Sequence, residues 1–476
     1  MKTRKSEFKE IVGYGIGGVG EDIAYNIFYM FFIFFLTTVA GITPAAAGTI
    51  SLCAVAWDAI SDPIIGYLSD KYKGNKFGKR ATFILGGAIP LGICVFLLFC
   101  DVDLGSGAKF AYFIGINILF WLFFTIVDIP YISVASEITS DYDVKTKMRT
   151  SVLLFSNLGQ MILAFGIMKF IEIMQGCGQE DVLTWRIIGA VLGTITAIAF
   201  LLTAVSLRGK EAKAKIEMGK AVEQNSENEA KGNVLQDVLD FFKLKQFRLV
   251  AAMGFVYNIN LGVVNSSLMF YLMYACQFTT GEIAFINLWP LVISIFLIVP
   301  MGGFAVKFGK RTGMMSAFIF LVLFSIVMSF TTPNMPTMIV MVAGLMVACA
   351  AFWILIYAMN FDVAEIYEFR FEKNREGLMI SIVSFLTKLG VALGMWANGM
   401  LMTKLGVDPT STVVTEAMSS GMHTIFGKVP LVLTITMVVL CIFYKISKNK
   451  ITALQEAKAL KAEGKEYSTE GFADIL

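Results

Sequence analysis

Apolar runs of roughly twenty residues recur along the whole 476-residue chain, and a helix of about that length crosses the hydrocarbon core of a bilayer. In that layer the backbone must satisfy its own hydrogen bonds, as a helix does. We count twelve such runs, at 11–40, 44–68, 82–100, 109–136, 149–173, 186–206, 248–275, 281–305, 313–331, 337–361, 378–403 and 429–446. The sequence therefore predicts an all-α membrane protein with twelve transmembrane helices.

The composition supports this class. The chain is 57% hydrophobic and 16% charged, with a mean hydropathy of +0.71, whereas soluble domains contain about 25% charged residues. A net charge of +3 gives no sign of a nucleic-acid partner. We expect membrane lipids to surround a functional monomer in a bacterial cytoplasmic membrane.

The distribution of lysine and arginine predicts the orientation. Basic residues gather after the second, eighth and tenth runs, at Lys71, Lys73, Lys76, Lys79, Arg80, Lys307, Lys310, Arg311, Arg370, Lys373 and Arg375. The opposite loops at 41–44 and 332–336 contain none. Because cytoplasmic loops are enriched in these residues, we expect both termini in the cytoplasm.

An internal repeat divides the chain. Residues 76–80, Lys-Phe-Gly-Lys-Arg, recur at 307–311, each time after the second run of a half. Such parallel repeats are known from transporters. We therefore predict a six-helix bundle at 1–206, a cytoplasmic connection with a surface amphipathic helix at 207–247, a second bundle at 248–446 and a cytoplasmic tail at 447–476.

Ionisable residues inside the runs are candidates for function. Asp58 and Asp62 lie four residues apart and share one helix face. Each carboxylate at membrane depth costs about 2.5–3.5 kcal/mol, and a bound cation would offset that cost. Asp22, Asp128 and Lys388 also lie inside runs, where such residues mark substrate or ion paths; Lys388 could alternatively only neutralise the acidic cluster. Glu21 is a weaker candidate than Asp22, since adjacent helical residues point about 100° apart and seldom face the same cavity.

Other classes of function are not supported. The single histidine, His423, falls in a predicted external loop, which excludes a histidine proton relay. We find no nucleotide-binding loop, metal-ligand cluster or nucleophile–base pair. We expect neither an enzyme nor a cofactor, apart from a coupling cation.

Several motifs resemble the glycoside–pentoside–hexuronide:cation symporters of the major facilitator superfamily, and the resemblance covers nearly the whole chain. They are Gly20-Glu21-Asp22, Trp57-Asp58-Ala59-Ile60-Ser61-Asp62-Pro63, Asp70 with Gly78-Lys79, Thr125-Ile126-Val127-Asp128-Ile129-Pro130-Tyr131, Asp362 with Glu365 and Glu368, and Thr387-Lys388-Leu389-Gly390. The resemblance implies the major facilitator fold, with two pseudo-symmetric six-helix bundles.

The resemblance also implies roles for individual residues. Asp58 and Asp62 would bind the cation with help from Thr125, and Ser61 lies between them. Substrate contacts would come from Asp22, Asp128, Trp353 and Lys388, and a cytoplasmic gate from Asp70, Gly78 and Lys79.

This chain departs from the family at informative positions. Ser61 replaces an asparagine, so the cation could be Na⁺, Li⁺ or H⁺. Ile132 replaces a sugar-contacting tryptophan, and Leu153 aligns with a sugar-binding arginine. Arg149, one turn earlier, is the remaining basic candidate for the substrate. This chain therefore matches the family more fully at the cation-site positions than at the sugar-site positions.

The expected function is uptake of a sugar or glycoside, with pentosides and hexuronides included, coupled to a monovalent cation by alternating access. Two alternatives stay open. One is a lipid or lysolipid carrier of the same fold. The other is a nutrient sensor that binds solute without moving it and signals through the tail at 447–476.

Overall fold

The structure is a computed structural model that describes residues 4–72, 74, 78–138, 142–208, 234–373, 375–411, 413–462 and 465–475. All regular elements of these residues are helices. This is the outcome expected of a chain whose apolar runs must satisfy their backbone hydrogen bonds in lipid.

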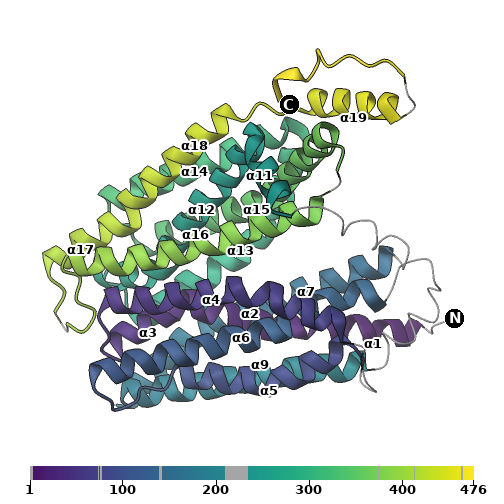
Figure 1. Ribbon diagram of the computed structural model, residues 1–476. Coiled ribbons are helices and arrows are strands. Elements are labelled where there is room, and N and C mark those ends of the chain that lie inside the picture. Colours follow the sequence, from purple (N-terminus) through teal and green to yellow (C-terminus); the bar gives the residue numbers. More distant parts are fainter. Residues whose placement is uncertain are drawn as a thin grey trace.

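Figure 1 shows two groups of helices lying side by side, with the first half of the chain in purple and blue and the second in green and yellow. The first half consists of α1 (Arg4–Gly15), α2 (Gly17–Ile27), η1 (Phe28–Phe32), α3 (Ile33–Thr38), α4 (Pro44–Lys71), α5 (Arg80–Leu98), α6 (Ser106–Ile138), α7 (Tyr142–Met161), η2 (Ile162–Ile167), α8 (Met168–Gly176) and α9 (Asp181–Leu207). The segments α1–α3 and α7–α8 each form one long crossing.

The second half follows the same plan. It consists of α12 (Lys245–Phe270), η3 (Tyr271–Ala275), α13 (Thr280–Phe308), α14 (Lys310–Phe330), α15 (Met335–Phe371), α16 (Glu376–Lys404), α17 (Glu416–His423), η4 (Thr424–Lys428) and α18 (Val429–Phe443). Among the described residues, eleven helical segments are long and apolar enough to cross a membrane. The helix in the eighth predicted position, α13, is 29 residues long and contributes an apolar stretch at Thr280–Ile293.

The repeated loop motif adopts a related backbone in both halves. Gly78 has φ +116° and Gly309 has φ +87°, a region that favours glycine because other residues meet steric strain there. Each glycine precedes a helix of equivalent position, α5 or α14. Within the described residues, the glycine of the repeated motif therefore has a similar backbone conformation in both halves.

The last crossing begins earlier than the sequence predicts. The hydroxyl of Thr415 accepts a hydrogen bond from the Met418 amide and caps α17, which then continues through η4 into α18. His423, expected in an external loop, ends α17, with its Nδ1 2.7 Å from the Met328 carbonyl oxygen. The polar residues of α17 lower its hydropathy and conceal this extension in the sequence.

Two short helices pack against the second half. The amphipathic helix expected at the bilayer surface is α11 (Val234–Lys243), whose Phe241 ring stacks on Tyr367 with centroids 3.9 Å apart. The buried Asp237 accepts hydrogen bonds from Lys373 and Arg375 at 2.6 and 2.9 Å. These contacts fix α11 to the end of α15, which the distribution of basic residues predicts to be cytoplasmic.

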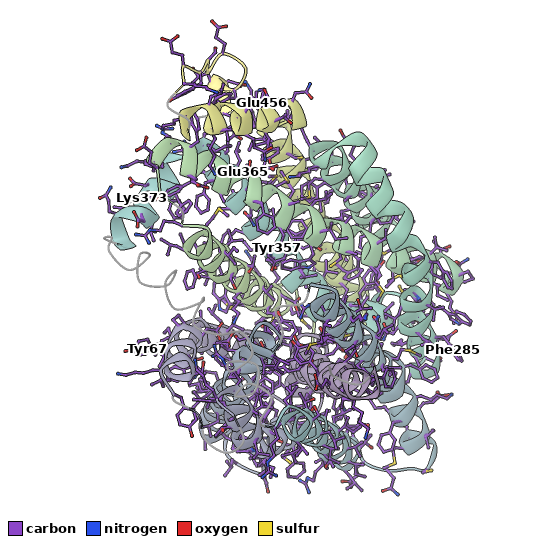
Figure 2. All side chains as sticks on the ribbon, turned by 90° about the vertical axis from the view of Figure 1, so that its right-hand side faces the viewer. Tyr67, Phe285, Tyr357, Glu365, Lys373 and Glu456 are labelled. Atoms are coloured by element: carbon purple, nitrogen blue, oxygen red, sulfur yellow. The ribbon has the colours of Figure 1, made fainter. Side chains whose placement is uncertain are left out.

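The tail is also docked. Its helix α19 (Lys448–Ala462) places Lys458 2.7 Å from Glu368, and Gln455 donates to Glu365 at 2.9 Å. Leu454 and Phe472 are buried beside it. Figure 2, turned to face this end of the molecule, shows the tail helix at Glu456 beyond Glu365. The described part of the tail is thus packed against the second half.

The two halves meet most closely along α4 and α16. A Cβ built on Gly399 would lie 2.1 Å from the Pro44 carbonyl oxygen, and the Ala45 amide donates to Thr403 at 3.2 Å. Phe34 of α3 and Phe270 of α12 also meet between the two halves, with ring centroids 5.4 Å apart. Small residues permit such close helix packing in membranes. These contacts lie on the predicted external side, whereas Ile64 and Tyr67, further along α4, are exposed.

Candidate cation and substrate site

The candidate cation site starts with two carboxylates on α4. Asp58 is 1% exposed and Asp62 is half-buried, one helical turn later. Pro63 follows within the same helix. Helical spacing alone therefore places both carboxylates on one face, as the sequence predicts.

Thr125 on α6 joins the pair. Its hydroxyl lies 3.0 Å from Oδ1 of Asp58 and 3.1 Å from Oδ1 of Asp62. The Ser61 hydroxyl donates to the Asp58 carbonyl at 3.1 Å and lies 3.4 Å from the Thr125 hydroxyl. All four residues of the predicted cation site thus lie together, and their oxygens are the hard ligands that small cations prefer.

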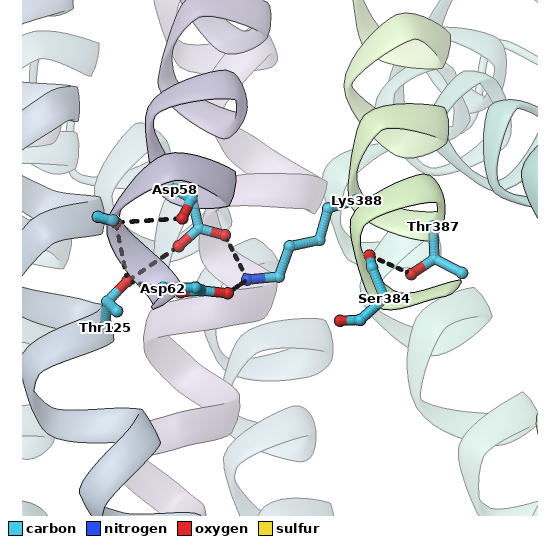
Figure 3. A network of polar contacts seen from close by, with 7 residues as sticks. Asp58, Asp62, Thr125, Ser384, Thr387 and Lys388 are labelled. Carbon is cyan, nitrogen blue, oxygen red and sulfur yellow. Dashed lines mark hydrogen bonds and ion pairs between the residues drawn. The ribbon is translucent and has the colours of Figure 1, made fainter. Parts of the chain in front are cut away.

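Lys388 reaches this cluster from the other half. Its Nζ lies 2.6 Å from Oδ2 of Asp58 and also bonds to Oδ2 of Asp62 (Figure 3). The resemblance implies that Lys388 lies near both the cation and the substrate site, and the contacts seen here are those with the two cation-site carboxylates. Its ammonium supplies the positive charge that a bound monovalent cation would supply.

Asp22 and Asp128 present free acceptor oxygens. Oδ1 of Asp22 accepts a hydrogen bond from Asn26 at 2.8 Å, whereas its Oδ2 has no hydrogen-bond partner among the described residues. Oδ1 of Asp128 likewise has none. Asp128 follows Thr125 by three residues on α6, so the two share a face. Buried carboxylate oxygens without donors suit a ligand rich in hydroxyl groups.

Aromatic side chains of both halves are candidates for packing against a sugar ring. Trp353 on α15 is half-buried and stacks with Tyr357, with ring centroids 6.0 Å apart. Tyr357 is 48% exposed and is labelled within the second half in Figure 2. Tyr357 is not among the residues predicted from the sequence, although its spacing of four residues from Trp353 places both on one helix face. Across from them, Tyr25 packs edge-on against Trp121 at 6.2 Å.

Arg149 lies away from the Asp22 carboxylate. Gly159 on α7 packs against Asp22, and Arg149 precedes Gly159 by ten residues, or about 15 Å of helix. Arg149 is exposed there and acts electrostatically on Glu21. Ile132 and Leu153, the two apolar departures, are also exposed, at 48% and 57%.

The predicted gate is only partly within the described residues. Gly78 is buried and Lys79 is half-buried before α5. The side chain of Asp70 lies outside the described residues. Arg80 next to them donates to the Ser69 hydroxyl at 2.6 Å and so ties the start of α5 to the end of α4.

Comparisons with known proteins agree with this architecture. The family described as MFS/sugar transport protein matches residues 13–448. The inner membrane symporter YicJ of Escherichia coli is 24% identical over 96% of both chains. The isoprimeverose transporter of Lactiplantibacillus pentosus is 21% identical over 96% of this chain and 92% of its own.

A similar solved structure is a bacterial homologue of the human lysosomal transporter Spinster, in an inward-facing, unoccupied conformation. It superposes with a TM-score of 0.66 at 14% identity, covering 93% of this chain and 97% of its own. At that identity the likeness concerns the fold, which is the major facilitator fold expected from the sequence.

Proposed function

Because this chain belongs to the MFS/sugar transport family, whose model spans residues 13–448, we propose that it is a symporter that couples sugar or glycoside uptake to a monovalent cation. The observation that carries the proposal is the bond network of Asp58, Asp62 and Thr125, which Lys388 joins from the opposite half. In this network the carboxylates that we propose to bind the cation also hold Lys388, and this bond connects the two bundles. Transport of sugar-type substrates also fits the named relatives.

In the proposed cycle, Lys388 and the coupling cation compete for the same carboxylates. Without the cation, the ammonium of Lys388 neutralises the pair and holds α16 to α4. A cation bound by Asp58, Asp62, Thr125 and Ser61 weakens the hold on Lys388. The lysine is then free to turn toward the substrate beside Asp22 and Asp128.

This exchange supplies coupling. If the cation frees Lys388 and relaxes α4, the sugar binds better when the cation is present, and by linkage the cation binds better when the sugar is present. The close contact of Gly399 with Pro44 on the predicted external side supports an inward-facing arrangement here. Alternating access then requires these helices to part while the opposite ends approach.

The chemistry of the proposed cation site suits more than one cation. Two adjacent carboxylates and two hydroxyls can hold Na⁺ or Li⁺, and the same carboxylate pair can share a proton. We propose Na⁺ as the first ion to test, with Asp58 and Asp62 as its charged ligands.

A binding screen tests the proposed function. Purified full-length protein is titrated with glycosides, pentosides and uronides, with and without Na⁺ at fixed pH. In proteoliposomes, Asp58→Asn and Asp62→Asn should abolish accumulation against a gradient. The control Asp103→Asn, on an exposed loop, should accumulate normally. Retained accumulation in both site variants would refute the cation site.

The same assays address the two alternatives. A lipid carrier would bind lysolipid and ignore every sugar, although the unpaired oxygens of Asp22 and Asp128 favour hydroxyl-rich ligands. A sensor would use the tail as its output, whereas α19 is bonded to Glu365 and Glu368. Uptake that persists after deletion of residues 448–476 would contradict the sensor.

A further inference from the structure

The aromatic side chain of Tyr25 shares a helix face with Asp22. The two residues are three positions apart on α2, so their side chains are neighbours on its surface. Oδ2 of Asp22 has no hydrogen-bond partner among the described residues. Tyr25 is 38% exposed, whereas Tyr29, four positions further along, is buried. A partly exposed aromatic ring therefore lies one helical turn from an unpaired carboxylate oxygen.

Two contacts set the register between α2 and α6. Near the start of α2, a Cβ built on Gly17 would lie 2.5 Å from the Tyr131 ring of α6. Further along α2, the ring of Tyr25 lies 6.2 Å from that of Trp121 and 6.1 Å from that of Phe124, measured between centroids. Increasing residue numbers on α2 thus meet decreasing numbers on α6, and the two helices are antiparallel.

This register places Asp22 level with the functional part of α6. Asp22 lies between the two contacts on α2, and Thr125 and Asp128 lie between the same two contacts on α6. Oδ1 of Asp128 also has no hydrogen-bond partner among the described residues. Because α2 begins at the predicted cytoplasmic end, Tyr25 lies on the predicted external side of these carboxylates.

The ring of Tyr25 is held in place by other rings. Tyr29 packs against it with centroids 4.6 Å apart, and Trp121 meets it edge-on at an interplanar angle of 88°. A ring that is already fixed loses little conformational freedom when a ligand packs on it. The exposed side chain one turn beyond Asp128 on α6 is instead the aliphatic Ile132. Tyr25 is therefore the aromatic surface available beside Asp22.

We propose that Tyr25 binds the substrate by stacking on the apolar face of a pyranose ring, whose hydroxyl groups donate to Asp22 and Asp128. The inference rests on the proposed function and adds a residue to its substrate site. A pyranose presents C–H groups on its face and hydroxyl groups at its edge. An aromatic ring beside two carboxylates offers a matching surface to both.

The test measures sugar affinity in variants of Tyr25. Methyl glucopyranoside, galactopyranoside and xylopyranoside are titrated into the full-length protein at saturating Na⁺. For the sugar that binds the wild type most tightly, Tyr25→Leu should lower affinity about fivefold or more, because the aromatic face is lost. Tyr25→Phe keeps that face and should stay within about twofold of the wild type. A loss in Tyr25→Phe as large as that in Tyr25→Leu would overturn stacking.

The matched control is Tyr467→Leu. Tyr467 has the same exposed fraction of 38%, and it lies in the tail against Phe369. Its replacement removes an equally exposed aromatic ring far along the chain from α2. Sugar affinity should not change in this variant, and an equal loss in Tyr467→Leu and Tyr25→Leu would contradict a specific contact at Tyr25.

Sodium affinity distinguishes a substrate contact from a packing role. Tyr25 packs against Phe124, which is adjacent to Thr125 of the candidate cation site. If Tyr25 served only to pack α2 against α6, its loss would also disturb Thr125. We expect the Na⁺ affinity of Tyr25→Leu, measured without sugar, to stay within about twofold of the wild type, which also shows that the variant is folded. A parallel fall in Na⁺ and sugar affinity would overturn the proposal.

The remaining outcomes separate this inference from the proposed function. If the wild type binds no sugar of the glycoside, pentoside and uronide screen, the proposed function fails and the role of Tyr25 fails with it. If the wild type binds sugar and Tyr25→Leu binds it equally well, only the role of Tyr25 is overturned, and the symporter proposal stands.

Discussion

The ammonium of Lys388 lies 2.6 Å from Oδ2 of Asp58, and this bond connects α16 of the second half to α4 of the first. The two residues are 330 positions apart in the sequence. A buried carboxylate without a partner is costly, so the lysine stabilises the arrangement in which the site holds no other cation. We infer that the same bond must break when the coupling cation binds.

Replacing Lys388 therefore separates two modes of transport. In Lys388→Gln the two carboxylates lose the positive charge of the lysine. The protein should then need a bound cation whenever it changes between its inward-facing and outward-facing conformations. Exchange of sugar across proteoliposomes should stay within about threefold of wild type, whereas net uptake, which needs the empty carrier to return, should fall about tenfold or more. Lys404→Gln, at the other end of α16, is the control. Equal loss of both modes would contradict this role.

Thr125 should contribute to cation affinity through its hydroxyl. Thr125→Val keeps the shape and removes the group that lies 3.0 and 3.1 Å from Asp58 and Asp62. We expect cation affinity to fall about tenfold, equivalent to about 1.4 kcal/mol. The measurement is a Na⁺ titration of sugar binding. Thr194→Val, on an exposed face of α9, should bind cation normally; an unchanged affinity in Thr125→Val would remove Thr125 from the site.

Gly399 should control the balance between conformations. A Cβ at this position would lie 2.1 Å from the Pro44 carbonyl oxygen, so Gly399→Ala must push α16 away from α4 on the predicted external side. Overpacking of this kind costs about 1–3 kcal/mol. We expect slower maleimide labelling of Ile64→Cys, which is exposed in the present arrangement.

Gly115→Ala provides the matched control for that experiment, since a Cβ there meets open space on α6. It should leave the labelling rate of Ile64→Cys unchanged. Faster labelling in Gly399→Ala, or equal effects of both alanines, would contradict the assignment of the packed side.

The connection between α11 and α15 should be sensitive to acid. The hydrogen bond from Lys373, helped by the Arg375 guanidinium, lowers the pKa of Asp237 below its ordinary value. The carboxylate therefore stabilises the fold above the ordinary pKa of about 3.9, and this contribution is lost as the pH falls through the lowered value. Thermal unfolding of wild type should show this loss on acidification.

Asp237→Asn should lower the free energy of unfolding at neutral pH by about 1 kcal/mol, and with it the unfolding temperature. The variant should not show the loss of stability that protonation of the Asp237 carboxylate gives the wild type on acidification. Asp103→Asn, on an exposed loop of the first half, is the control and should keep the loss of stability on acidification. An identical pH profile in wild type and Asp237→Asn would show that the ion pairs do not hold α11 in place.

The sequence predicts the helical crossings well because apolar length and charge-poor composition are local properties. The four cation-site residues could also be grouped, since Asp58, Ser61 and Asp62 lie on one helical turn and Thr125 is carried by a recognisable motif. Elements that depend on tertiary packing were harder to predict. The docking of α19 on Glu365 and Glu368, and the inclusion of His423 in the last crossing, rest on partners distant in the chain.

Glu21 shows the same limit at the site. Helical geometry argues that neighbouring residues point in different directions, which favours Asp22 alone. The structure instead gives both Glu21 and Asp22 a buried oxygen that has no hydrogen-bond partner among the described residues. Other helices surround α2, so that more than one of its faces is buried. The periodicity of a single segment cannot show which neighbours surround a helix.

Reciprocal binding measurements show whether sugar and Na⁺ are coupled through Asp58, Asp62 and Lys388. The affinity of purified protein for its best glycoside is measured at zero and saturating Na⁺, and the affinity for Na⁺ at zero and saturating glycoside. Competition between Lys388 and the cation for Asp58 and Asp62 predicts that both affinities rise by the same factor, about fivefold or more, and that Lys388→Gln reduces this factor toward one. Sugar affinity that is independent of Na⁺, Li⁺ and pH in the wild type would contradict the account.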